Sequence, residues 1–259
     1  MTKPPMPLFY NEVVALDRKA HARLRVRQPD NYAFTANATL IPLVSAEFAP
    51  VAREYPIAFM TDKDNVVIPV ALTGMPQSKN LFVDKDGKWD ARYIPAYVRR
   101  YPFAFVETAA ENYTVCIDPT SKLLSEKEGT PLFEASGEPT ATLQDTIKRL
   151  GEYQRVMQFT RTFMKRLADA NLLMEANAKA DFPDGRSMTW RGFWIVDENR
   201  FRALPEATVK EWFTSGELGL LYAHLLSLGN LADLLGRHSR EAGLTSAPAP
   251  AAAPAAAKA

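Results

Sequence analysis

Two adjacent arginines between tyrosines form the cluster in this sequence that is best suited to binding an anion. Arg99 and Arg100 follow Tyr97 and precede Tyr101. A guanidinium group donates two parallel hydrogen bonds to a carboxylate or phosphate, and an aromatic ring can stack against its face. One hypothesis is therefore a pocket for a small acidic or peptide-like ligand, with a concave surface at Arg99 and with Tyr97 exposed.

A structural role is the alternative for the same two arginines, and on the sequence alone we favour it. Arginines at the end of a helix commonly bond to its last carbonyl groups and pair with nearby carboxylates. Glu47 and Asp90 are candidates for such pairs. The two interpretations differ in an observable way, because a ligand site needs a pocket and guanidinium groups that internal salt bridges do not occupy.

His224 is the histidine in the most informative position. It lies in the apolar segment 220–228, with Ser227 three residues later and Glu217 seven residues earlier, so the three can share one face of a helix. It could form a polar floor beneath the arginines or act as an acid or base. We favour a buried histidine that is hydrogen-bonded to a loop carbonyl. The candidate ligand-binding residues are Tyr97, Arg99, Arg100, Tyr101 and His224.

Motifs for bond-making chemistry are absent from the sequence. It contains no G-x-S-x-G nucleophile turn, no G-x-G-x-x-G fingerprint and no loop ending in G-K-[ST]. The one cysteine, Cys116, lies in an apolar run that we interpret as a buried strand, and the three histidines are far apart. We therefore expect no metal, no cofactor and no catalytic residue.

The leading hypothesis is a non-catalytic binding or accessory protein whose partner is an unknown protein or a small acidic ligand. The alternative is an enzyme, or the partner of an enzyme, that acts on a small carboxylate or a peptide side chain. Such an enzyme would use His224 and the region of Arg99 and Arg100, and it would need the imidazole within about 3 Å of a carboxylate or hydroxyl inside a cleft.

Charge and hydropathy exclude other classes of partner. The 259 residues include 31 basic and 30 acidic side chains, a net charge of +1, so nothing marks a nucleic-acid or anionic-membrane surface. Polar residues and glycines interrupt the most apolar segment, 218–235, whereas a membrane helix needs about 18 apolar residues in a row. The N-terminus lacks the apolar core of a signal peptide. We expect a cytoplasmic protein. The sequence leaves open an export to the surface by a non-classical route, and it does not give the oligomeric state.

Apolar periodicity predicts an α+β fold. Expected strands lie at 33–36, 57–60, 66–72, 81–83, 103–106, 113–117 and 193–196. Turn residues 62–65 should join the second and third of these as an antiparallel hairpin. Helical spacing predicts helices at about 141–177, where Thr140 can cap the first turn, after Pro205 and at about 217–238. We expect a mainly antiparallel sheet from the N-terminal half, with the C-terminal helices packed on it.

Composition divides the chain into three parts. Residues 1–30 form an N-terminal extension in which Leu24 and Val26 alternate with arginines, as in a short edge strand. Residues 31–240 form a single α+β domain. Residues 241–259 are rich in alanine and proline, and we expect a disordered tail there.

A short internal repeat includes the arginine cluster. Residues 53–59, Arg-Glu-Tyr-Pro-Ile-Ala-Phe, match residues 99–105, Arg-Arg-Tyr-Pro-Phe-Ala-Phe, and an Ile-Pro pair precedes each copy. Proline disfavours helical geometry in the residue before it, so Tyr55 and Tyr101 should each end a helical turn. The proline that follows should open a buried strand in each copy.

The block Tyr93-Ile-Pro-Ala-Tyr-Val-Arg-Arg-Tyr-Pro-Phe103 resembles the SapC family. Further pieces extend the resemblance from about residue 8 to about residue 240, namely Glu47-Phe48, Tyr55-Pro-Ile57, Gly192-Phe193, Val196-Asp-Glu198 and Leu221-Tyr-Ala-His-Leu225. The family takes its name from a bacterial surface-layer gene cluster and carries no assigned enzymatic activity. The resemblance therefore implies a bacterial protein linked to surface-layer or envelope processes, and it supplies no functional residue.

Overall fold

A five-stranded antiparallel sheet forms the centre of the computed structural model, which describes residues 6–62, 66–109, 112–181 and 187–243. β4 (Ile57–Thr61) and β5 (Val67–Leu72) form the predicted hairpin, with Ile57 opposite Ala71 and Thr61 opposite Val67. The order of the strands is β10 (Leu173–Asp181), β11 (Ser187–Val196), β4 (Ile57–Thr61), β5 (Val67–Leu72) and β3 (Leu40–Pro42).

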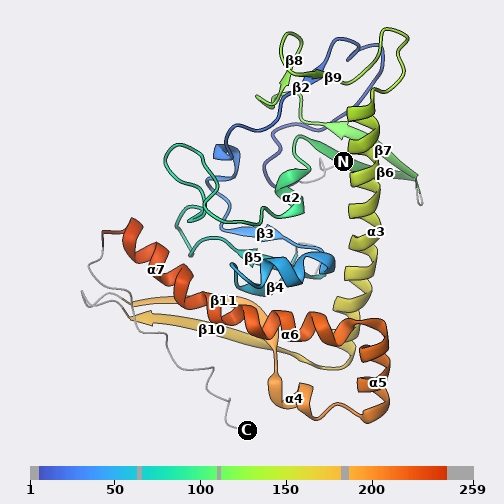
Figure 1. The fold of residues 1–259 in the computed structure, drawn as a ribbon. Helices are drawn as coiled ribbons and strands as arrows, with labels where there is room; N and C mark the ends of the chain where they lie inside the picture. Colours follow the sequence, from blue (N-terminus) through green and yellow to red (C-terminus); the bar gives the residue numbers. More distant parts are fainter. Residues whose placement is uncertain (1–5, 63–65, 110–111, 182–186, 244–259) are drawn as a thin grey trace, which may run out of the picture.

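Two smaller antiparallel sheets lie in the upper half of the view in Figure 1. One has the order β1 (Val14–Ala15), β7 (Asn112–Ile117) and β6 (Phe103–Ala109). The other has the order β8 (Leu124–Ser125), β2 (Arg25–Val26) and β9 (Thr130–Pro131). β2 thus lies between two strands, and not at the edge of a sheet as its sequence suggested. Cys116 lies in β7 and is buried, as expected.

Helices connect and cover the sheets. Two short helices, α1 (Phe48–Val51) and α2 (Ala96–Arg99), precede the long α3 (Ala141–Asp169). The C-terminal part contains α4 (Glu198–Arg202), α5 (Glu206–Ser215), α6 (Glu217–Ser227) and α7 (Leu231–Glu241). Short 3₁₀ helices lie at Ala33–Thr35, Ser45–Glu47 and Leu228–Asn230. The described chain therefore has the predicted α+β fold.

α3 runs along one side of the molecule, from the small sheets to the C-terminal helices (Figure 1). Thr140 caps its first turn, as predicted, because its hydroxyl accepts a hydrogen bond from the Leu143 amide. The first half of α3 buries Leu143 and Leu150 against β6 and β7. The second half buries Phe163, whose ring meets that of Phe48 edge to face in the main core. One helix thus holds both halves of the fold together.

The predicted helix at 141–177 is too long, because α3 ends at Asp169 and residues from Leu173 onward form β10. Asn171 has a positive φ of 51°, a conformation in which asparagine often follows the end of a helix. The sequence of β10 contains several helix-forming residues, but pairing with β11 along its whole length overrides that propensity. The predicted last helix at 217–238 is likewise divided by the 3₁₀ turn at Leu228–Asn230.

Two predicted strands are also wrong. Residues 33–36 include a 3₁₀ helix, which begins where the Asn31 side chain accepts a hydrogen bond from the Ala33 amide. Such a local bond competes with strand pairing. Residues 81–83 contribute only an isolated bridge between Val83 and Trp89. The expected disordered tail has most of its length in 244–259, which lies outside the described residues.

The segment from α6 to α7, Glu217–Glu241, has a mean hydropathy of 1.4 over its most apolar 18-residue window. By length and composition it is the one described helix that could cross a membrane. This is weak evidence for a span, because a helix packed on a protein core meets the same criterion. In that window 28% is buried in the protein, and Leu221 and His224 of α6 are fully buried.

Candidate functional site

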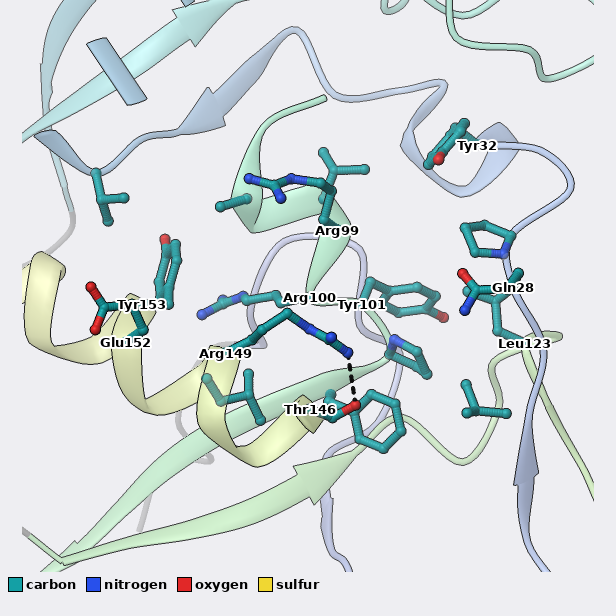
Figure 2. A pocket seen from close by; sticks show the side chains of 18 of the residues that line it. Gln28, Tyr32, Arg99, Arg100, Tyr101, Leu123, Thr146, Arg149, Glu152 and Tyr153 are labelled. Carbon is teal, nitrogen blue, oxygen red and sulfur yellow. Dashed lines mark hydrogen bonds between the residues drawn. The ribbon is translucent and has the colours of Figure 1, made fainter. Parts of the chain in front are cut away.

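A cavity of about 580 Å³ lies between α2, α3 and the segment that follows β2. Arg99, Arg100 and Tyr101 line it from the end of α2, so the expected concave surface at Arg99 is present. Figure 2 shows their side chains between α3 and the segment that carries Gln28 and Tyr32. The volume of the cavity falls within the range of about 300–1,000 Å³ that is typical of small-molecule sites.

Arg100 has a cationic group that no carboxylate neutralises among the described residues. Its Nε is buried and has no hydrogen-bond partner there. Its guanidinium carbon lies 4.0 Å from the centre of the Tyr97 ring and 4.9 Å from that of Tyr153. Aromatic faces stabilise a cation without supplying a counter-charge. The Tyr97 and Tyr153 side chains therefore hold the arginine in place, and no described carboxylate offsets its charge.

Arg99 is bonded to neutral groups. Its Nε donates to the carbonyl oxygen of Ile94 at 2.9 Å, and its Nη2 donates to the hydroxyl of Tyr93 at 3.2 Å. Asp90 pairs with Arg237 at 2.6 Å. The internal salt bridges that would have given the arginines a purely structural role are therefore not formed within the part of the chain that the structure describes.

Glu47 is the carboxylate that fixes α2. Its Oε1 accepts hydrogen bonds from the Ala96 amide at 2.6 Å and from the Tyr93 hydroxyl at 2.9 Å, and its Oε2 accepts one from the Val44 amide at 3.1 Å. Burial raises the pKa of Glu47 above its usual range, against the opposing effect of these hydrogen bonds. Burial, and then the nearby Glu47, raise the pKa of Tyr93 to about 12. The Glu47 carboxylate therefore holds the start of α2 in place.

The two tyrosines of the cluster are placed differently. Tyr97 is only 8% exposed, and its hydroxyl accepts a hydrogen bond from the Leu8 amide at 3.1 Å. The expectation that Tyr97 is exposed was wrong, because this ring supports Arg100 from behind and does not line the cavity. Tyr101 does line it, stacked on Phe34 with ring centres 4.5 Å apart, and its hydroxyl donates to Asp118 at 3.3 Å.

Sequence reasoning missed the contribution of α3 to this cavity. Thr146, Arg149 and Tyr153 line it, and Arg149 Nη2 donates to the Thr146 hydroxyl at 3.1 Å. Their spacing of three and four residues places them on one face of the helix. A polar and aromatic stripe on an otherwise apolar face was the signal that could have identified them.

The structure does not bring His224 to the cavity. Its Nε2 accepts a hydrogen bond from the Val196 amide at 3.1 Å, and its ring lies 4.5 Å from that of Phe59. Burial lowers the pKa of His224 to about 3. The Ser227 hydroxyl donates to the backbone carbonyl of His224, and Glu217 pairs with Arg166 at 2.8 Å. These three polar residues of α6 therefore serve separate contacts in the core.

The fold and the site together describe an α+β protein with an arginine-lined cavity between a short helix and a long one. A family model described as SapC matches residues 16–234, which is most of the chain. The chain therefore belongs to the SapC family. Neither the curated proteins nor the solved structures include a significant match to it.

Proposed function

We propose that this chain is a non-catalytic binding or accessory protein that takes a small acidic ligand into the cavity beside Arg100. The observation that carries the proposal is the guanidinium group of Arg100, which lines a cavity, has a buried Nε without a hydrogen-bond partner and has no carboxylate partner among the described residues. Taking a charge out of water costs several kcal/mol, roughly, unless a counter-charge or hydrogen bonds offset it. A carboxylate or phosphate from a ligand would supply both.

The surroundings favour an anion over a cation or a neutral ligand. Arg99, Arg100 and Arg149 all line the cavity without an ion pair to any described carboxylate. Glu47 is occupied by the backbone of α2, and Glu152 is paired with Arg155. The positive charge of Arg99 stabilises the nearby Glu47 carboxylate. Arg100 and Arg149 are therefore the cationic groups of the wall that no described carboxylate offsets. Charge-assisted hydrogen bonds from arginine are among the strong ones in proteins.

No observation favours the enzymatic alternative, which needed His224 inside a cleft. His224 is fully buried and does not line the cavity. We therefore do not propose a catalytic role for it. A link to surface-layer or envelope processes and a cytoplasmic location stay part of the present proposal, and the family resemblance and the composition are their only support.

Octanoate, a carboxylate with an apolar chain, is a suitable probe for this function. Isothermal titration of the full chain should detect its binding, and Arg100→Gln should weaken that binding by about tenfold or more, the value of one charge-assisted hydrogen bond. Arg23→Gln is the matched control, because Arg23 is exposed at the surface and the charge change is the same. Binding that is absent in the wild type, or equal in both variants, would refute the proposal.

A further inference from the structure

The cavity is larger than the single anionic group that Arg100 would bind. A carboxylate occupies roughly the volume of two or three waters at about 30 Å³ each, whereas the cavity measures about 580 Å³. Much of the remaining wall is apolar, with the partly exposed Val26, Pro29, Phe34 and Val156 among its lining residues. An inorganic ion would leave these groups facing water. The ligand that fits therefore carries an apolar body as well as its charge.

A second guanidinium group marks another part of the same cavity. Arg149 donates from Nη2 to the Thr146 hydroxyl at 3.1 Å and, among the described residues, has no ion pair with a carboxylate. Figure 2 shows the side chain of Arg100 directed toward Tyr153, while that of Arg149 is directed the other way, toward Thr146. The two cationic groups therefore serve different ends of the cavity and would not converge on one anion.

The two carboxylates in the wall do not neutralise this pair. Glu47 is held by Ala96, Tyr93 and Val44 at the start of α2. Glu152 lies 2.6 Å from Arg155 in an ion pair on the exposed face of α3. An apolar wall lies between these two positive charges. A complementary ligand would therefore have two negative charges separated by an apolar spacer.

We propose that the cavity takes an elongated organic acid with one anionic group at each end of an apolar body, and that Arg100 binds one end and Arg149 the other. This inference rests on the proposed function, since it adds a second charge to a ligand that Arg100 already binds. Thr146 acts as a positioning residue, because its hydroxyl holds the Arg149 guanidinium toward its end of the cavity.

Three carboxylates separate this proposal from simple anion binding. Suberate has two carboxylates at the ends of an eight-carbon chain, octanoate has one on a chain of the same length, and succinate has two on a short chain. Isothermal titration at pH 7.5 and constant ionic strength keeps all of them ionised and the screening equal. Suberate should bind the wild type about tenfold to a hundredfold more tightly than octanoate, the value of one further charge-assisted hydrogen bond.

Variants assign the two ends. Arg149→Gln should reduce the advantage of suberate over octanoate to less than about twofold, because the second carboxylate loses its partner while octanoate keeps its bond to Arg100. Arg100→Gln should weaken the binding of both suberate and octanoate, and Arg23→Gln should leave both affinities unchanged. Arg149 is exposed at the surface, so its replacement leaves the fold intact.

The outcomes distinguish this inference from the proposed function. Equal binding of suberate and octanoate, or a loss of both in Arg149→Gln, would overturn the two-ended ligand and leave the role of Arg100 standing. Succinate binding as tightly as suberate would overturn the requirement for an apolar spacer. Absence of binding for suberate and octanoate alike would overturn both proposals together.

Discussion

The stability of the folded chain should depend on pH through His224. Burial lowers the pKa of this imidazole from 6.5 to about 3, so below pH 6.5 the unfolded chain binds a proton that the folded chain does not. The stabilisation from the neutral ring is therefore complete above about pH 6.5 and is lost as the pH falls toward 3. One proton corresponds to about 1.4 kcal/mol per pH unit, which gives on the order of 5 kcal/mol across the window.

His224→Gln isolates this contribution. The amide oxygen can still accept the hydrogen bond from the Val196 amide, but the side chain no longer titrates. Urea unfolding of both proteins at pH 7.5, 6.5, 5.5 and 4.5 gives the free energy of unfolding at each pH. The stability of the wild type relative to the variant should fall by about 1.4 kcal/mol for each pH unit below pH 6.

Ser227→Ala is the control for a loss of core contacts in the same helix. The Ser227 hydroxyl accepts a hydrogen bond from the Ile57 amide at 2.9 Å, and leaving that amide unsatisfied should cost about 1–3 kcal/mol. This loss should be nearly the same at every pH, so the control keeps the wild-type slope. Parallel stability curves for the wild type and His224→Gln would refute the reasoning, because they would mean that the folded chain protonates His224 as readily as the unfolded chain does.

Two further substitutions test how the elements around the cavity are held. Thr160→Val should lower the free energy of unfolding by about 1–3 kcal/mol in urea titrations, because the buried amide of Ser45 loses its partner at 2.8 Å; an unchanged midpoint would contradict this. Glu47→Ala should cost about 3 kcal/mol or more, since one buried and two partly buried donors lose their acceptor. It should also weaken octanoate binding, and retained affinity would show that α2 does not need this carboxylate.

Local signals in the sequence were enough to predict the elements that form from neighbouring residues. The hairpin of β4 and β5 follows from two apolar runs around a polar turn, and the Thr140 cap follows from one side chain. β10 could not be predicted in the same way, because its residues favour a helix and its strand conformation depends on pairing with β11. Tertiary pairing of this kind leaves no mark in a window of ten residues.

The residues of the candidate site likewise differ in whether the sequence could identify them. Arg99, Arg100 and Tyr101 could be singled out from the sequence because they are adjacent, and they share a cavity wall. Arg149 and Tyr153 come from a helix about 50 residues later, and only the packing of α3 beside α2 joins them to the cluster. His224 has the residue type expected at a site, but the face of α6 that carries it packs on Phe59. Residue type alone could not decide between a core and a cavity.

The internal repeat offers a comparison between two equivalent positions. Glu54 in the first copy corresponds to Arg100 in the second. The Glu54 carboxylate accepts hydrogen bonds from the backbone amides of Arg92 and Tyr93 at 2.8 and 2.9 Å, so it fixes the loop before α2.

Arg100 occupies the same local position after a helical turn and before a tyrosine and a proline, yet it has no carboxylate partner among the described residues and lines the cavity. The backbone motif therefore does not itself require the side chain at this position to be bonded internally. Glu54 and Glu47, both from the region of the first copy, hold the loop and helix that present Arg100, and this support leaves the arginine of the second copy available to a ligand.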